Sequence, residues 1–467
     1  MSSSAPKKRE RVDLTTGPLA QHLWSMATPM IVGILAVIGF NFADTLFISS
    51  LGTDPLAAIS LTFPVVFSLS SLTLGIGVGV SSVVSRAYGQ GDKQQSQRFT
   101  THALLLGLTV VSIFLVIGFL TIDPLFRALG AKPKLMPYVH EYMEIWYLGM
   151  FFLIIPMIGN GAIRAIGDAR FPAMVMIIAG VVNLILDPFL IFGWGPFPRL
   201  EMKGAAIATV ASRSLTAIAA IWVLHKRENL ILWGVPKIRE VWASWKEILF
   251  VGLPAAANQM VGPLSLGIIT SLLSIYGKET IAGFGAATRI ESLFMIGVFA
   301  VSSGNAPIVG QNWGAKRIDR ISEVVRLSFK ICLLYGLGVA IVLALVGPFL
   351  SKAFDSKVAV YSVTNAYLWI VPISYGTLGL FFVSSSTFSA IGKPGPATTL
   401  TFLRAFGVYV PLSLLGRHFF QEKGVFAAAT LANLLTGLLA MYWLYKLLQQ
   451  EQKDHPLESN DSSRMEG

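Results

Sequence analysis

The sequence predicts an all-α integral membrane protein, and three observations carry that prediction. Only 13% of the 467 residues are charged, about half the share of an ordinary soluble domain, whereas 54% are hydrophobic. The mean hydropathy is +0.65. The apolar residues stand in long unbroken runs, unlike the short alternating segments of a transmembrane barrel. Because open strands and loops would leave backbone groups unpaired in lipid, we expect each run to cross the membrane as a helix.

Twelve such runs predict twelve transmembrane helices in two six-helix lobes. They lie at about residues 20–50, 55–85, 97–121, 136–159, 170–193, 203–225, 245–275, 280–308, 321–349, 358–387, 396–416 and 424–448. A polar segment with tryptophans separates the sixth run from the seventh. We therefore divide the chain into a cytoplasmic polar tail (1–19), an amino-terminal lobe (20–225), a cytoplasmic linker (226–244), a carboxyl-terminal lobe (245–448) and a second cytoplasmic tail (449–467).

The two halves repeat one another at a nearly constant spacing. Tyr88–Gly89 returns in the second half as Trp313–Gly314, and Ala165–Gly167 returns at the same interval as Ala390–Gly392. Such matches predict an internal duplication. Because six is even, both lobes would enter from the same side, related by an axis along the membrane normal. Folds of this kind commonly place a substrate cavity between the lobes.

The basic residues predict the orientation of the helices. Of the 36 Lys and Arg residues, 22 fall on the side of the termini and the linker, and 10 on the opposite side. The richer side should be cytoplasmic, which puts both termini inside the cell. The net charge of +11 therefore reflects topology, and we expect no nucleic-acid partner. The single cysteine, Cys332, excludes an internal disulfide and should be a buried, inert thiol.

Polar side chains inside the spans of the first half form a candidate site. An aspartate at the centre of a span costs about +2.5 to +3.5 kcal/mol on insertion scales, so Asp44 in the first span needs a reason. Asn183 and Asp187 stand four residues apart and project from one face of the fifth span. The residues that could complete a polar pocket are Thr209 on the sixth span and Asn160 and Tyr142 on or near the fourth.

These groups suit a cation. Na⁺ prefers hard oxygen donors, which two carboxylates, an amide and a hydroxyl supply. The candidate Na⁺ ligands are Asp44, Asn183, Asp187 and Thr209. A proton fits equally, because two carboxylates in a low dielectric repel each other and one should take up a proton easily. The alternative is that the groups only hydrogen-bond one another and lock the helices together.

Pro29 lies about a third of the way along the first span, where it removes a helix hydrogen bond and bends the chain. The bend could couple a change of charge at Asp44 to movement of the lobes, or it could be a static kink.

The second half has far fewer ionisable groups in its spans. Glu291 is the only acidic candidate, and Arg289, two residues away, points to a different helix face. Asn258 and Gln259 in the seventh span could line a cavity or join helices.

No motif points to an enzyme. The six histidines show no metal-ligand spacing, and no nucleophile stands with a base. The sequence has no phosphate-binding loop, so ATP does not drive the chain directly. We expect no cofactor, with H⁺ or Na⁺ as the coupling ion and no metal site beyond that Na⁺.

Over residues 20–448 the chain resembles the multidrug and toxic compound extrusion (MATE) transporters. The resemblance is carried by Asp44, by Asn183-x-x-x-Asp187-Pro188, by Asn160-x-x-x-Arg164-Ala-Ile-Gly167-Asp168, and by Gly204–Thr209. The span-one aspartate with the Asn/Asp pair is similar to the DNA-damage-inducible (DinF-like) branch. It implies a bend at Pro29 and a cation or proton network of Asp44, Tyr142, Asn160, Asn183, Asp187 and Thr209. The acids that another branch carries on spans seven and ten are missing here.

The resemblance implies a multi-pass antiporter in the plasma membrane, the inner membrane of a prokaryote. It would export amphipathic, often cationic, drugs or toxic organic compounds as H⁺ or Na⁺ enters. Neutralising Asp44 and Asp187 would repack the first span and release the drug from an amino-lobe cavity. We expect it to act as a monomer, in contact with lipid and with no nucleotide partner.

Two other functions are compatible with the sequence. A flippase for a lipid-linked precursor needs several cations facing the cavity, for which the candidates are Arg213, Arg289 and Arg404. A receptor or scaffold would transport nothing, so Asp44→Asn would leave every flux unchanged.

Overall fold

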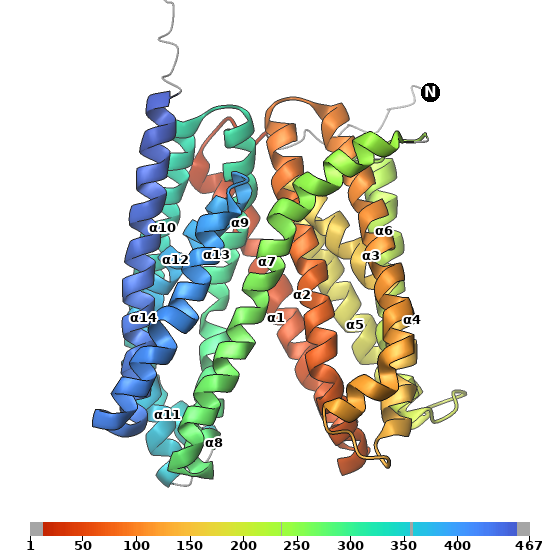
Figure 1. Ribbon diagram of the computed structural model, residues 1–467, viewed down its shortest axis with the longest axis vertical. Helices are drawn as coiled ribbons and strands as arrows, with labels where there is room; N and C mark the ends of the chain where they lie inside the picture. The colour runs from red at the N-terminus through yellow and green to blue at the C-terminus, as the bar shows by residue number, and fades with distance from the viewer. Residues whose placement is uncertain (1–12, 235, 355–357, 455–467) are drawn as a thin grey trace, which may run out of the picture.

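The computed structural model describes residues 13–234, 236–354 and 358–454, and nearly all of this part of the chain is helical (Figure 1). The first half contains α1 (Leu19–Ser49), α2 (Thr53–Gly89), α3 (Lys93–Ala128), α4 (Met136–Ala165), α5 (Arg170–Phe192), α6 (Glu201–Trp222) and the π-helix η1 (Val223–Arg227). The second half contains α7 (Ile238–Leu273), η2 (Ser274–Tyr276), α8 (Lys278–Phe294), α9 (Ile296–Gly314), α10 (Ile318–Phe354), α11 (Val358–Ile370), η3 (Pro372–Ser374), α12 (Tyr375–Ala390), α13 (Pro394–Phe402), the π-helix η4 (Leu403–Tyr409) and α14 (Val410–Asp454).

The helices account for the twelve predicted membrane crossings. Ten of the described helices are long and apolar enough to span a membrane, and α8 with α9, bent by 43°, forms an eleventh. The twelfth comes from the stretch Pro394–Asp454, whose backbone leaves the helical region at Phe420 and Gln421. The two arms of this stretch pack against each other through the backbone at Gly416 and Gly424.

Local sequence explains where several helices begin and end. Asp92 stands just before α3, and its side chain accepts a hydrogen bond of 2.8 Å from the backbone N–H of Gln95, as an N-cap residue does. Gly193 ends α5 in the left-handed conformation, with φ of 75°, which glycine adopts without steric cost.

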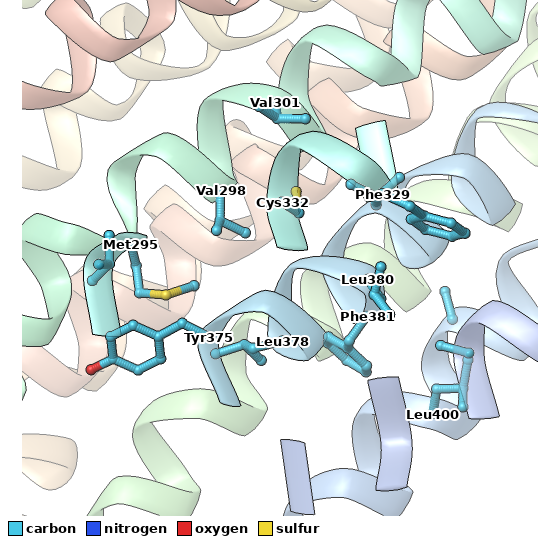
Figure 2. Packing of buried hydrophobic residues seen from close by; sticks show 14 of the residues in the cluster. Met295, Val298, Val301, Phe329, Cys332, Tyr375, Leu378, Leu380, Phe381 and Leu400 are labelled. Carbon is cyan, nitrogen blue, oxygen red and sulfur yellow. The ribbon is translucent and has the colours of Figure 1, made fainter. Parts of the chain in front are cut away.

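Each half of the chain packs around its own apolar core. Trp146 and Tyr147 are buried in the core of the first half. In the second half Cys332 of α10 is 1% exposed, with Val298 and Val301 of α9 nearby (Figure 2). The expectation of a buried thiol is therefore confirmed.

The two lobes lie closest where α1 begins and α14 ends, at the top of Figure 1, and diverge toward the bottom. Their contact runs along α2 against α7 and along α1 against α9. At the top, the Oγ of Ser82 donates to the carbonyl of Ser389 at 2.6 Å, and the Nε2 of Gln311 donates to the carbonyl of Ala165 at 2.7 Å. Both bonds lie at the end where the lobes are closest.

The repeated glycines explain how the lobes approach so closely. A Cβ on Gly89 would stand 1.9 Å from the carbonyl oxygen of Gln311, and one on Gly314 would stand 2.0 Å from that of Arg86. Only glycine leaves room for backbone on backbone at these positions. The repeat of Tyr88–Gly89 as Trp313–Gly314 therefore marks a symmetric contact across the interface.

Candidate functional site

Four helices of the amino-terminal lobe bring ionisable side chains together. Asp44 on α1 and Asp187 on α5 lie within hydrogen-bond range of each other, and Arg213 on α6 is close enough to interact electrostatically with Asp44. Tyr142 on α4 interacts with all three groups. Asn183 donates from Nδ2 to the Oδ1 of Asp187 at 3.4 Å, a long bond one turn away on the same helix.

The two carboxyl groups of this cluster are incompletely satisfied. Asp187 is fully buried, and neither its Oδ2 nor the Oδ1 of Asp44 has a hydrogen-bond partner among the described residues. A hydrogen bond between two carboxyl groups requires a proton on one of them, because an ionised carboxylate only accepts. With both acids ionised and Arg213 charged, the cluster carries one net negative charge. One H⁺ or one Na⁺ would neutralise it.

Among the described residues, no hydrogen bond links the remaining amino-lobe candidates to the carboxyl pair. The hydroxyl of Thr209 donates to the carbonyl of Ala205 on its own helix at 3.0 Å. The Oδ1 of Asn160 is buried without a partner in the described part of the chain, and no described contact links it to the acids.

From the sequence we expect Arg213 only as a cavity cation of a flippase, and not as a partner of Asp44. The spacing could have indicated the partner role, because Arg213 follows the candidate Thr209 by four residues and therefore shares its helix face.

Pro29 lies where α1 changes its neighbours. Before it, Leu19 and Leu23 belong to the core of the second half. Around it, Met26 and Met30 pack with Ala169, at the start of α5, and with Ala300 of α9. Proline has no N–H to bond the preceding turn, so α1 lacks one helix hydrogen bond where it passes from one lobe to the other.

A second polar cluster lies in the carboxyl-terminal lobe. Tyr367 of α11 donates its hydroxyl to the Oε2 of Glu291 on α8 at 2.5 Å. Arg404 on η4 donates to the Oδ1 of Asn433 at 2.7 Å, and Asn433 donates to the Oγ of Ser374 at 3.0 Å. The guanidinium of Arg404 also stands 5.4 Å from the ring centre of Phe381. The sequence gives no signal for Tyr367 or Asn433, because neither is unusual in a span by itself.

A cavity of about 600 Å³ lies beside this cluster, between the lobes. Its lining comes mostly from the second half, with Val78, Ser81, Ser82, Ser85 and Arg164 from the first. Of the second-lobe candidates, Asn258, Gln259 and Glu291 line it, whereas Arg289 is exposed and does not. The cavity therefore differs from the amino-lobe drug cavity that we expected, since Asp44 and Asp187 are not in its wall.

The charged residues of the cavity wall are two arginines and one acid, namely Arg164, Arg404 and Glu291. Aromatic rings and many hydroxyl and amide groups complete the wall. The residues of this kind include Phe284, Phe299, Phe382, Tyr409, Ser302, Ser385, Ser389, Asn258 and Asn433. The wall is thus more polar and more cationic than a purely apolar drug pocket.

No resident metal centre is indicated in the parts of the chain that the structure describes. There, no three His, Cys, Asp or Glu side chains gather where they could hold a metal ion together. The oxygen atoms of Asp44, Asp187 and Asn183 suit a coupling Na⁺, which would be cargo and not a cofactor.

Two six-helix lobes that share a cavity define a class of membrane transporters. The chain belongs to the MatE family, whose model matches residues 29–189 and again residues 254–415. The two matches begin at the same interval that separates Gly89 from Gly314, which agrees with the predicted duplication. Members of this family are transporters, not enzymes.

The names of proteins similar to this chain refer to different transported compounds. The FAD transporter of Shewanella oneidensis is 36% identical over 441 residues, which cover 94% of this chain and 98% of that protein. The probable multidrug resistance protein YoeA of Bacillus subtilis is 26% identical and covers 86% of this chain and 88% of that protein. The structure of the Vibrio cholerae MATE transporter VcmN in the bent form is 29% identical, with a TM-score of 0.88, over 93% of this chain and 98% of that one.

Proposed function

We propose that this protein is a secondary antiporter that exports an amphipathic organic compound in exchange for H⁺ or Na⁺. The observation that carries the proposal is the acid pair of the half-buried Asp44 and the buried Asp187, with a single compensating arginine, Arg213. Such a cluster changes from net negative to neutral when it takes one cation. Ionisable groups inside a membrane protein commonly serve this purpose, because each is costly without a function.

The proposed cycle links the two lobes through α1. A cation that binds between Asp44 and Asp187 removes their repulsion and changes how α1 packs on α5. Since α1 also packs on α9, a bend at Pro29 would transmit this change to the lobe interface. The organic compound would leave from the inter-lobe cavity, and exchange would follow if the cation-bound form disfavours the occupied cavity.

The orientation follows from the basic residues. We place the end of the molecule that carries both termini in the cytoplasm. The bonds between Ser82 and Ser389 and between Gln311 and Ala165 then close the cytoplasmic side. The divergence of the lobes at the other end then corresponds to an outward-facing state in the plasma membrane. The Asp44, Asn183 and Asp187 pattern supports the DinF-like branch within the family.

Two substrate classes are supported by different observations. Amphipathic, often cationic drugs are supported by the multidrug relatives, including the protein from Bacillus subtilis. Flavin adenine dinucleotide (FAD) is supported by the 36% identical relative named for it and by a cavity wall with two arginines and one acid. The second candidate departs from our expectation that no nucleotide is a partner.

The test is uptake into inside-out proteoliposomes, with a pH gradient or a sodium gradient imposed separately. A fluorescent cationic dye and FAD would be offered in parallel to the wild type, Asp44→Asn and the surface control Asp54→Asn. We expect flux with one gradient, loss in Asp44→Asn and retention in the control. Wild-type flux in Asp44→Asn would overturn the coupling proposal. No flux of either compound would favour the lipid flippase, which lipid translocation would then test.

A further inference from the structure

We propose that the inter-lobe cavity is an organic-anion site, in which Arg404 and Arg164 bind a phosphate-type group attached to a planar aromatic ring. The inference rests on the proposed function, since it takes this cavity as the place of the transported compound. It chooses the anionic class from the two candidate substrate classes and adds the residues that select it.

The first argument is an unbalanced charge. Arg404 is hydrogen-bonded to the amide oxygen of Asn433, which is neutral. Glu291 is near enough to interact electrostatically with Arg404, but its hydrogen bond goes to the hydroxyl of Tyr367. No ion pair to Arg404 is found in the described residues. An arginine inside the membrane with neutral hydrogen-bond partners favours an anionic ligand.

Arg164 adds a second cation from the other lobe. Its NH1 donates to the hydroxyl of Ser303 at 3.1 Å, and its Nε donates to the carbonyl of Asn160 at 3.3 Å. Within the described ranges no carboxylate pairs with it. The two guanidinium groups line the same cavity, one from α4 and one from η4, and arginine forks suit phosphate oxygens.

The backbone at Arg404 is itself unusual. Leu403–Tyr409 forms a π-helix between α13 and α14, and its residues Arg404, Ala405 and Tyr409 line the cavity. π-Helical turns are rare and are frequent at functional sites. Here Arg404 is the arginine that the π-helix contributes to the cavity wall.

The rest of the wall fits a polar aromatic molecule. Phe299 and Phe382 form an edge-on pair with ring centres 5.0 Å apart, beside hydroxyl groups such as those of Ser302 and Ser385. Rings of this kind stack on a planar ligand, and hydroxyl groups hydrogen-bond sugar or phosphate oxygens. The volume of about 600 Å³ lies within the range of sites that hold organic cofactors.

The experiment measures binding without any gradient, using purified wild-type protein in detergent. Riboflavin, flavin mononucleotide and FAD share one fluorescent ring and carry none, one and two phosphates. We expect affinity to rise along this series, with inorganic pyrophosphate competing. Arg404→Gln should weaken FAD binding about tenfold or more and riboflavin binding little, as expected for loss of a charge-assisted hydrogen bond. Arg404→Lys should recover part of the loss, and Arg289→Gln, at an exposed arginine outside the cavity wall, is the matched control.

Three outcomes would overturn the inference: equal affinity for riboflavin and FAD, tighter binding of a cationic dye than of FAD, or FAD binding unaffected by both Arg404→Gln and Arg164→Gln. The comparison of ligands on the wild type decides the question even if a variant fails to fold. Gradient-driven dye flux with no preference for phosphate would contradict the organic-anion site and support the antiporter. Arginine-dependent FAD binding without gradient-driven flux would support the organic-anion site and contradict the antiporter.

Discussion

The two lobes share one scaffold and differ in charge. Tyr142 and Tyr367 stand on matching helices, at the same interval as Gly89 and Gly314, and each lies beside an acid of its own lobe. At that interval, however, Asp44 is matched by the buried Ile269. The slightly shorter interval that relates Gly204 to Gly424 matches Arg213 with Asn433. The segment α13–η4, which corresponds to α5, carries an arginine and no acid.

The difference shows how a duplicated fold acquires two tasks. Duplication preserved the helix packing, including the paired glycines at the interface. At a few corresponding positions the two lobes differ, so that the first has an excess of acids and the second has an arginine at the cavity. In our proposal the first lobe takes the coupling cation, and the organic compound lies between the lobes in a cavity whose wall comes mostly from the second lobe. Four changes would break or sharpen this contrast.

The largest effect is expected from Asp187→Asn. An amide cannot take up or release a proton, and it is a weaker cation ligand, so gradient-driven flux should fall about 100-fold or more, equivalent to about 2.7 kcal/mol. Binding of the organic compound in detergent should stay within about twofold, because Asp187 is absent from the cavity wall. Loss of both flux and binding would mean that cation binding and binding of the organic compound are not separate functions of different sites.

Gly89→Ala tests a contact that both lobes share. The added methyl group would meet the carbonyl oxygen of Gln311, so we expect a loss of about 1–3 kcal/mol of stability, and Gly314→Ala should cost as much. The measurement is heating in the presence of a thiol-reactive dye, which reports exposure of the buried Cys332. Gly267→Ala, where nothing stands within 4 Å, is the control. Equal melting of all variants would contradict the close approach.

The two matching tyrosines should respond differently to loss of the hydroxyl. Tyr367→Phe removes the hydroxyl donor to Glu291 and leaves this half-buried acid without that hydrogen bond, which should cost about 1–3 kcal/mol of stability. No hydrogen bond is described for the hydroxyl of Tyr142, so Tyr142→Phe should cost less. Thermal melting of both variants decides the matter, and an equal loss would mean that the two clusters are held in the same way.

The smallest effect is expected at Lys134, outside the spans. Its ammonium lies 2.7 Å from the Oδ2 of Asp54, and this hydrogen bond raises the pKa of Lys134. A lysine whose pKa is raised by folding stabilises the folded state at every pH below its unfolded pKa. This stabilisation is lost as the pH rises through the folded pKa. Both lie far above neutrality, so the pair adds no pH dependence between about pH 6 and 8. Lys134→Gln should therefore leave the pH profile of flux unchanged, and a shifted profile would show that this surface pair takes part in coupling.

Much of the fold could be predicted because lipid restricts the choices. The apolar runs predict the helices, and the constant spacing of motifs predicts the two lobes. Asp44 and Asp187 stood out because an acid in a span is costly. Arg213 and Arg404 were visible as cations but not as partners, since the sequence does not say which helix faces meet.

Composition and repetition thus determined by themselves that this chain is a twelve-helix, two-lobed membrane protein with acids in its first lobe. The reason is that burial in lipid and helical periodicity act on each segment separately. Only the tertiary structure decided which side chains lie together. Arg213 joins Asp44, and Glu291 on α8 joins Tyr367 on α11, while the cavity forms beside the lobe that lacks the acid pair. Those contacts depend on how whole helices pack, and packing is a property of pairs of surfaces that no single segment contains.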